Sequence, residues 1–516
     1  MTEDQQQVEA PGRGPSSGES TPAGHLKGEP QAPAEGSALW RRVHKATPVI
    51  KSWQVIAALM AAIAFYAFDD ILRNFGRLPA LWIVGAVLGI LVVALLISLV
   101  YSYFAWKRTA YAIGADAVYF HKGILFRSQR HARLNRIQGV DITRPLLGRL
   151  VGLSSLAIET AGGGDSKVVI EYLKDEEAER LRTEVLARAA GLKARQAGED
   201  PAAPSFARAP ERVVNELPAG QLVVSLLLSL GTIIGVIALV VAFAIPVALG
   251  EPMGLVGMLP VFFIFASVTW VYFSGHFGHT LAISPDGIRL RHGLLSTQSQ
   301  TIPPGRIQAV KLTQPFLWRG KDWWKVEINV AGYGISSSTD NTSNVLSRQV
   351  LLPVASREIA LRALWLVQRD LGVDDPQSAL DAGMVGSLGD AGFMHSPRSA
   401  RWVDPISWKR NGLLITRSVM LMRSGRITRE LVVVPHERTQ SLGVAQGPIQ
   451  RRLQVATFEG HSVPGPVLPR AKHLPQFVAM QVLAQQAQRA REARAKERPE
   501  EWMRRVGAVG VPVEEA

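Results

Sequence analysis

An arginine followed two positions later by a glutamine recurs at the same place in three related segments of this chain of 516 residues. The pairs are Arg136/Gln138, Arg306/Gln308 and Arg438/Gln440. A guanidinium group offers a rigid fork of donors that matches a phosphate, so each pair could bind a lipid headgroup or a protein partner. The alternative is structural, with both polar side chains bonding neighbouring loops while Ile137 and Ile307 fill the core.

Basic side chains also gather around two glycines that mark expected turns, Gly123 and Gly293. The two sets are His121, Lys122, Arg127 and Arg130, and Arg289, Arg291 and His292. A basic residue beside a membrane is attracted to anionic lipid by about 1 kcal/mol. Lys122, Arg127, Arg289 and Arg291 are therefore candidate headgroup contacts, and the alternative is an ordinary solvated loop.

The sequence offers little support for catalysis. The chain has no cysteine, which excludes disulfides, thiolate metal sites and cysteine nucleophiles. It has no phosphate-binding loop and no Gly-x-Ser-x-Gly elbow. His276 and His279 have helical spacing, but two side chains are a weak basis for a metal site. We predict no enzymatic activity, no cofactor and no metal.

Four apolar runs, at residues 53–68, 81–104, 222–249 and 255–273, indicate a membrane protein. A helix needs about 20 apolar residues to cross a bilayer, and only the first run is short for this. Short connections join the runs into two hairpins, so all larger domains must lie on one side of the membrane. Basic residues flank the first hairpin at Arg41, Arg42, Lys45, Lys51, Lys107 and Arg108. This pattern predicts that the protein lies in the cell membrane, with its domains and both termini in the cytoplasm.

The parts between the hairpins repeat. Residues 111–164 align with residues 281–334 without a gap, and 17 of the 54 positions are identical. A weaker third copy lies 302 positions after the first, where Gly425, Arg438 and Gln440 match Gly123, Arg136 and Gln138. Each copy has short runs typical of strands with Gly or Pro-Asp-Gly turns, followed by a helical run. The repeating unit is therefore predicted to be a small antiparallel sheet closed by a helix.

Each copy resembles the bacterial pleckstrin-homology-like (PH-like) domain of the YdbS/YdbT type, once classed as a domain of unknown function. The resemblance rests on the strand pair ending at Gly123 or Gly293, the Arg-Ile-Gln, the Pro seven residues on, a Leu/Trp stretch and Ala-Gly. The third copy has Thr439 in place of Ile and an extra residue before Pro448. The resemblance implies a β-sandwich or partly open barrel with a C-terminal helix at the inner membrane face, and it implies no enzyme.

The expected fold is a multi-domain membrane protein with two transmembrane α-hairpins and three β-rich PH-like domains. Its parts are a disordered tail (1–38), hairpin 1 (39–108), PH-like domain 1 (109–192), a linker (193–217), hairpin 2 (218–277), PH-like domain 2 (278–373), a linker (374–401), PH-like domain 3 (402–480) and an exposed charged helix and tail (481–516).

The expected function is that of a membrane scaffold whose PH-like domains bind anionic lipid headgroups or protein partners. The partner could be a second copy or a related membrane protein, and the family resemblance suggests envelope maintenance or stress tolerance. The net charge of +14 also suits nucleic acid, but the basic residues are dispersed and form no recognition motif, so no nucleic acid is expected. Alternatives are a transport component, an assembly platform without a lipid ligand, and an enzyme on lipid, which would need a carboxylate or His cluster at the domain–membrane junction.

Overall fold

The computed structural model describes residues 40–50, 52, 59, 80–114, 116–123, 127–160, 168–196, 211–250, 252–284, 287–303, 305–331, 349–368 and 370–496. Three expected features lie outside the described residues: the disordered tail, nearly all of the first apolar run, and the chain beyond residue 496.

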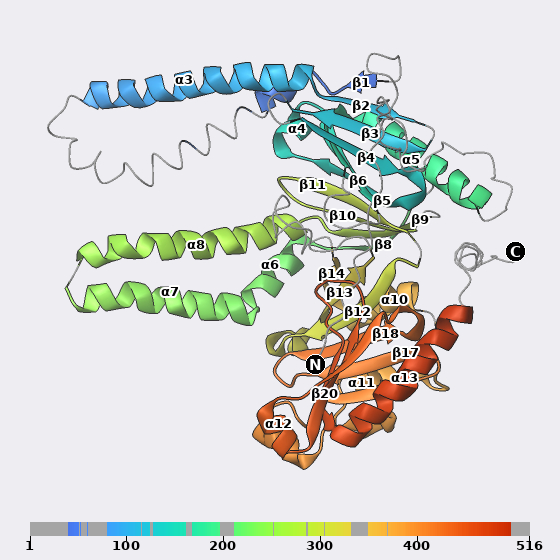
Figure 1. The fold of residues 1–516 in the computed structure, drawn as a ribbon. Coiled ribbons are helices and arrows are strands. Elements are labelled where there is room, and N and C mark those ends of the chain that lie inside the picture. The colour runs from blue at the N-terminus through green and yellow to red at the C-terminus, as the bar shows by residue number, and fades with distance from the viewer. Residues whose placement is uncertain are drawn as a thin grey trace, which may run out of the picture.

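The first PH-like domain consists of two small sheets and a closing helix (Figure 1). One sheet holds β1 (Trp40–Arg42), β2 (Ala110–Ile113), β3 (Ala117–Lys122) and β4 (Ser128–Arg133). The short helix η1 (Leu134–Arg136) leads into the other sheet, which holds β5 (Ile137–Arg144), β6 (Leu153–Thr160) and β7 (Val168–Lys174). Between β5 and β6 lies α4 (Leu146–Leu150), and α5 (Asp175–Gln196) follows β7. Helix α5 buries Leu181 and Val185 against both sheets.

The second domain repeats this order. Its strands are β8 (Arg212–Glu216), β9 (Thr280–Ser284), β10 (Gly287–His292), β11 (Thr297–Ile302), β12 (Ile307–Gln314), β13 (Trp323–Val330) and β14 (Val350–Ser356). The short helix η2 (Phe316–Lys321) takes the place of α4, and α10 (Arg357–Val367) closes the domain. Ser356 caps α10 by accepting a hydrogen bond from the amide of Ile359.

Helices α11 (Pro376–Met384) and η3 (Asp390–Gly392) precede the strands of the third domain, and η4 (Arg398–Trp402) lies between the first two of these strands. The strands are β15 (Met394–His395), β16 (Gly412–Ile415), β17 (Val419–Ser424), β18 (Arg429–Pro435), β19 (Ser441–Ala445), β20 (Val455–His461) and β21 (Arg470–Pro475). Here η5 (His436–Arg438) lies between the two sheets, α12 (Pro448–Arg452) takes the place of α4, and α13 (Gln476–Lys496) closes the domain.

Consecutive domains are joined by shared sheets. One seven-stranded sheet runs β7-β6-β5-β11-β10-β9-β8, so β5 of the first domain pairs with β11 of the second. The next runs β14-β13-β12-β18-β17-β16-β15, so β12 of the second domain pairs with β18 of the third. The three domains therefore form one continuous array, and we call each of these two strand pairings a joint (Figure 1).

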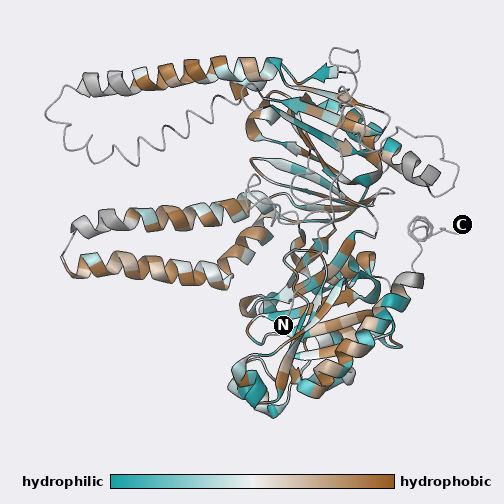
Figure 2. Ribbon diagram, in the orientation of Figure 1, coloured by the Kyte–Doolittle hydropathy of each residue, from teal (hydrophilic) through white to brown (hydrophobic). Residues whose placement is uncertain are grey.

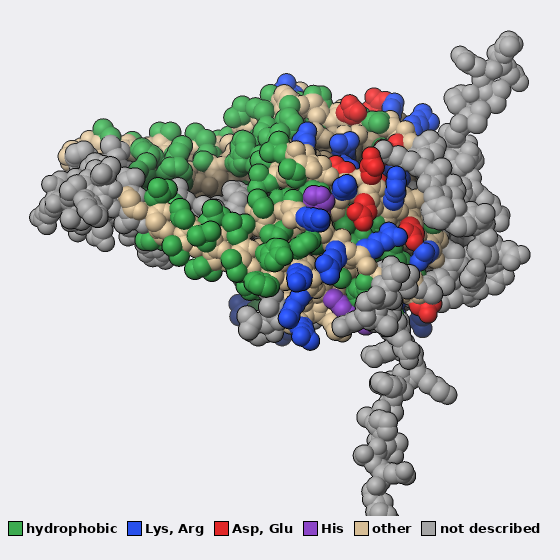
Figure 3. Space-filling model, turned by 90° about the horizontal axis from the view of Figure 1, so that it is seen from above, with side chains coloured by type: hydrophobic (Ala, Val, Ile, Leu, Met, Phe, Trp, Pro, Cys, Tyr) green, Lys and Arg blue, Asp and Glu red, His purple; other side chains and the backbone are tan. Residues whose placement is uncertain are grey.

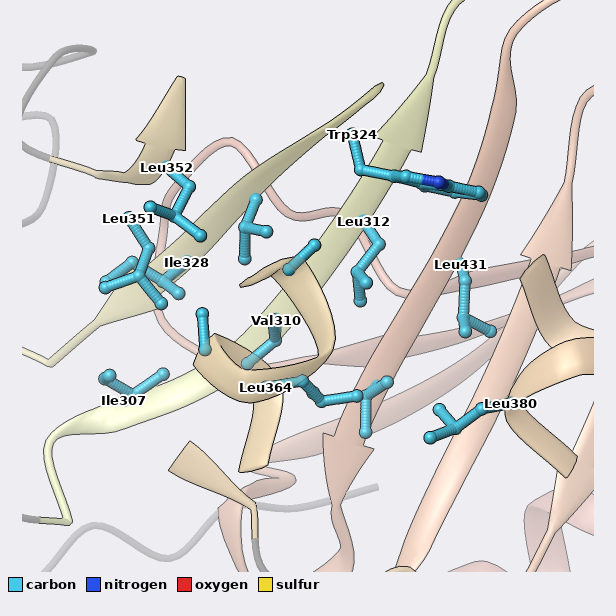
Figure 4. Packing of buried hydrophobic residues seen from close by; sticks show 14 of the residues in the cluster. Ile307, Val310, Leu312, Trp324, Ile328, Leu351, Leu352, Leu364, Leu380 and Leu431 are labelled. Carbon is cyan, nitrogen blue, oxygen red and sulfur yellow. The ribbon is translucent and has the colours of Figure 1, made fainter. Parts of the chain in front are cut away.

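The second joint is also a shared hydrophobic core. Figure 4 shows Leu312 and Trp324 of the second domain facing Leu431 of the third. All three side chains are fully buried and belong to one cluster. Because this cluster takes side chains from both domains, each domain contributes to the stability of the other.

Three helices are long and apolar enough to span a membrane (Figure 2). They are α3 (Ala80–Lys107), α7 (Leu230–Ala248) and α8 (Pro252–His276), with candidate spans at Leu88–Lys107, Leu230–Ala248 and Leu259–His276. All three protrude from the same side of the array (Figure 1). Within the protein only 6% of the apolar window of each span is buried, so nearly all of each span is exposed.

The third apolar run is divided, unlike the single span expected at 222–249. Its beginning forms a separate helix, α6 (Ala219–Leu227), and Ser229 caps the start of α7 by accepting from the amide of Thr232. Helix α6 packs on the second domain, where Trp318 donates its indole N–H to the carbonyl of Ser225 at 3.1 Å. Leu222 is buried in the same contact, so this stretch contributes to the domain as well as to the hairpin.

Three other segments differ from what the sequence predicts. The stretches taken as linkers contain β8, β15 and α11, and the two strands pair at the edges of the shared sheets. The C-terminal helix was expected to be exposed, but α13 buries Ala479, Val482 and Gln486 on one face. These residues recur at three- and four-residue spacing, so one stripe of the helix packs on the domain while its charges face outward.

Candidate membrane-facing site

The three Arg/Gln pairs lie at one equivalent corner of each domain, where the chain crosses from the first sheet to the second. Arg136 ends η1 and Arg438 ends η5, and each glutamine follows two residues later. Arg136 and Gln440 are exposed, and Arg306 and Arg438 are partly buried. Gln308 is buried and donates to the carbonyl of Arg306 at 3.3 Å. The side chain of Gln138 is outside the described residues.

These environments are too different for one repeated binding site. Arg438 lies against the corner of the preceding domain, since a Cβ added at Gly305 would be 3.4 Å from its Nη2. The amide of Gln308 is used within its own corner. These contacts fit the structural alternative for the pairs, in which the polar side chains bond neighbouring loops.

The basic turn residues also differ from one another in exposure. Lys122, Arg127 and Arg291 are exposed. Arg289, in contrast, is only 8% exposed and forms an ion pair with Glu211 beside strand β8. The sequence predicts a linker at residues 193–217, and this prediction does not place Glu211 beside a strand of the second domain. Arg289 therefore points into the protein and is not available for a headgroup.

The β10–β11 turn lies directly at the domain end of α8. The amides of Gly293 and Leu294 donate to the carbonyls of Phe277 and Ser274, both at 2.8 Å. Nδ1 of His292 is 2.8 Å from the carbonyl of Gly275. Gly293 has φ 113°, which favours glycine at this close approach. The exposed Leu295 and Arg291 of this turn consequently lie next to the membrane span.

A second recurring feature faces the same side: the short helices α4, η2 and α12, here called the loop helices. Figure 1 shows α4 and α12 on the side of the array from which the spans leave. Each loop helix exposes a large apolar side chain, as Leu150 (76%), Phe316 (58%) and Ile449 (63%) show. Each also carries arginine, at Arg149, Arg319, Arg451 and Arg452. An exposed apolar residue beside a cation is typical of a protein segment at the lipid interface.

The loop helices were present in the sequence but were used only as a mark of family resemblance. The signal is a proline followed by apolar residues and an arginine, as in Pro145 to Arg149 and Pro315 to Arg319. The exposure of the apolar side chains was not visible, because an apolar residue near a strand is usually buried. Figure 3 shows hydrophobic side chains over the protruding helices, with Lys and Arg side chains on the adjoining part of the domains.

Three histidines meet at the junction between hairpin 2 and the second domain, where the sequence had revealed no cluster. His276 ends α8, and His279 and His292 stack with ring centroids 5.8 Å apart. All three rings are buried, at 5%, 0% and 2% exposure. His292 is distant in sequence, so only the sheet brings it to the others. Among the described residues, no group of three His, Asp or Glu side chains could hold a metal ion.

The histidines are expected to make the second domain sensitive to acid. Burial, reinforced by His292 and His276, lowers the pKa of His279 well below its ordinary value. The unfolded chain then binds a proton below about pH 6.5 that the folded chain does not, so stability falls as the pH falls. The loss approaches about 1.4 kcal/mol per pH unit for this group.

Thermal unfolding of the full chain in lipid nanodiscs at pH 7.5, 6.5 and 5.5 measures this effect. His279→Phe should give a shallower dependence on pH below 6.5 than the unaltered chain. His395→Phe, at an exposed histidine, is the control and should leave the slope unchanged. Equal slopes for His279→Phe and the unaltered chain would contradict the prediction.

The paired half-sheets, the closing helices and the protruding spans together define a membrane protein with three PH-like domains in tandem. The chain belongs to the bacterial PH domain family, since the family model described as "Bacterial PH domain" matches residues 57–189, 223–368 and 392–489. The chain is also 30% identical over 100 residues to the UPF0699 transmembrane protein YdbT of Bacillus subtilis (strain 168). That match covers 19% of this chain and 20% of the relative, so it spans about a fifth of either protein. No solved structure is significantly similar.

Proposed function

We propose that this protein is a non-enzymatic membrane scaffold whose three PH-like domains form a rigid array along the cytoplasmic face of the cell membrane. The observation that carries the proposal is the common direction of α3, α7 and α8, which leave the array on the side that also bears α4 and α12 (Figure 1). With the spans in the bilayer, the loop helices are at the level of the lipid headgroups.

Charge supports the cytoplasmic orientation. Arg41 and Arg42 precede the first hairpin, Lys107 is the last residue of α3 and Arg108 follows it. Basic residues next to spans favour the cytoplasmic side. Labelling of an introduced Leu388→Cys with a membrane-impermeant maleimide tests this directly, because the chain has no other cysteine and Leu388 is exposed. The residue should react in inside-out vesicles and not in intact cells.

The ligand that best fits the loop helices is the anionic lipid headgroup. The third domain is informative because, among the described residues, no span lies between it and the second domain, so its α12 would contact lipid through Ile449, Arg451 and Arg452 without a span beside it. Each arginine contributes about 1 kcal/mol of attraction to an anionic surface, and a buried Ile adds apolar transfer energy. A role in envelope maintenance or stress tolerance fits such a scaffold and rests on family resemblance alone.

The headgroup contact is tested in vesicles that contain the full chain. Ile449→Cys carries an environment-sensitive dye, and quenching by nitroxide-labelled lipid reports contact with the bilayer. Quenching should increase with the fraction of anionic lipid and decrease with salt. Arg451→Gln together with Arg452→Gln should lower the equilibrium constant for contact about 25-fold, at about fivefold for each charge.

Two controls make this result specific. The dye at Gln488→Cys, on the exposed face of α13, should show little quenching in any lipid. Arg491→Gln, on the same exposed face, should leave quenching at position 449 unchanged. If the dye at position 449 is not quenched in any lipid, the headgroup proposal fails and a platform for protein partners becomes the better explanation.

A further inference from the structure

The two joints have the same strand register. In the first, Ile142 of β5 lies opposite Ser299 of β11. In the second, Leu312 of β12 lies opposite Leu431 of β18. The offset of 170 residues between the first two copies carries Ile142 onto Leu312, and an offset of 132 residues between the second and third carries Ser299 onto Leu431. The joint is therefore a repeated structural feature with one geometry.

Each end of the array carries one strand that corresponds to a strand of a joint, and the two ends carry the two different partners. At its first end, β4 is the outermost described strand of its sheet and corresponds to β11 and β18. At its other end, β19 is the outermost described strand of its sheet and corresponds to β5 and β12. Gln129 and Ala445 are exposed, whereas most residues of β11 and β12 are buried by their joints. A strand edge of this kind readily pairs with another strand.

The side chains at these two ends also match. In the second joint, Nη1 of Arg429 donates to Oε1 of Gln314 at 3.1 Å. The residue that corresponds to Gln314 is Gln446, directly after β19, and the residue that corresponds to Arg429 is Arg127, directly before β4. The two ends thus carry the same arginine and glutamine that meet in the second joint.

The side-chain amides of Gln314 and Gln446 are also oriented in the same way. Nε2 of Gln314 donates to Asp322 in its own domain at 2.9 Å, which turns Oε1 toward the neighbouring domain. Nε2 of Gln446 likewise donates within its own domain, to the carbonyl of Val455 at 3.1 Å and to Oε1 of Gln476 at 3.0 Å. Oε1 of Gln446 is then the atom that a neighbouring arginine would meet.

We propose that β19 of one copy of this chain pairs with β4 of a second copy, antiparallel and with Val444 opposite Gln129. The interface is heterologous, so each added copy presents the same free end again, and the copies form a row. Because the spans leave one side of the array, a row continued through this joint keeps every hairpin on the same side and extends along the membrane (Figure 1). The proposal assigns Arg127 to the joint, and it does not depend on lipid binding by the loop helices.

Cysteine cross-linking of the full chain in native membranes tests the register. Ser128→Cys and Ala445→Cys mark residues that would lie opposite each other in the new joint. Thr313→Cys with Glu430→Cys marks the corresponding pair in the second joint, where the two residues are partners within one chain. Since the register is the same, both pairs have the same geometry for a disulfide, and the internal pair is the positive control.

Two differently tagged chains, one with Ser128→Cys and one with Ala445→Cys, should form a single covalent heterodimer on mild oxidation. A chain with both substitutions should form a ladder of dimers, trimers and larger species. Gln129→Cys with Ala445→Cys is shifted by one residue, places the thiols on opposite faces, and should cross-link poorly. Arg127→Ala or Gln446→Ala should slow formation of the heterodimer at least about tenfold, the effect of one hydrogen bond to a charged group.

Two outcomes would overturn the proposal. The first is complete cross-linking of the internal pair without any heterodimer from the mixed chains. The second is efficient dimerisation of Ser128→Cys alone or Ala445→Cys alone, which would indicate symmetric pairing of identical edges. Lipid quenching at position 449 is measured on separate variants, so failure of either proposal is recognised independently of the other.

Discussion

Arg423→Met is expected to unfold the third domain or to destabilise it by about 3–5 kcal/mol. The Arg423 side chain is fully buried and lies 4.2 Å over the ring of Phe393. It donates to the carbonyls of Arg410 at 3.1 Å and Ala382 at 2.7 Å, and also to that of Leu388. Methionine fills similar volume but leaves these carbonyls buried without their donor, at about 1–3 kcal/mol each.

The loss of stability is measured by unfolding the full chain in urea. Limited proteolysis at each urea concentration reports how much of the third domain is unfolded. Arg423→Lys is the matched variant, because it keeps a cation but lacks the planar fork that reaches several carbonyls at once. Its loss should be smaller than that of Arg423→Met. Burial lowers the pKa of Arg423 to about 10, so the group stays charged at neutral pH and the effect should not depend on pH between 6 and 8. An unchanged urea midpoint for Arg423→Met would disprove the role assigned to this side chain.

Leu431→Ala is expected to destabilise the second and third domains together by about 2–5 kcal/mol. Leu431 belongs to β18 of the third domain, but its fully buried side chain packs in the cluster that holds Leu312 and Trp324 of the second domain (Figure 4). Truncation leaves a cavity in a core that both domains share. Calorimetry of the full chain should show the unfolding of both domains shifted to lower temperature as one transition.

Leu474→Ala is the control for this coupling. Leu474 is equally buried but belongs to a cluster made mainly by the third domain. Its truncation should lower the stability of the third domain with a smaller shift for the second. If Leu431→Ala lowered only the transition of the third domain, the shared core would not couple the two domains.

The repeat allowed much of the fold to be predicted from sequence. The turns at Gly123 and Gly293, the Arg-Ile-Gln segments and the apolar runs give local signals, and local signals fix strands, turns and spans. The sharing of sheets between domains could not be predicted in this way. Strand β11 reads Thr-Gln-Ser-Gln-Thr-Ile, which is as polar as an exposed edge, yet most of it is buried in the first joint. Pairing between distant strands leaves no periodic signal in either one.

The candidate site was less accessible to sequence reasoning for the same physical reason. Arg289 and Arg291 lie on the same face of β10, two residues apart. Only Arg289 is level with the start of β8, because its strand partner Ala282 pairs with Val213, and there it meets Glu211. His292 could not be connected with His276 and His279 until β9 and β10 were paired. The exposed side chains of the loop helices were hidden within a family motif, since exposure depends on packing that a motif does not describe.

The shared sheets have a mechanical consequence. Helix α3 connects to the first domain and the α7–α8 hairpin connects to the second. These two domains share a sheet through the pairing of β5 with β11, so α3 and the α7–α8 hairpin cannot change their spacing or tilt independently. The sheet shared by the first and second domains acts as a stiff strut beneath the bilayer. The third domain extends beyond the spans as a cantilever, held at one end by the second joint. Bending of the membrane along the strut must then either strain the strand pairings or lift the cantilever from the surface.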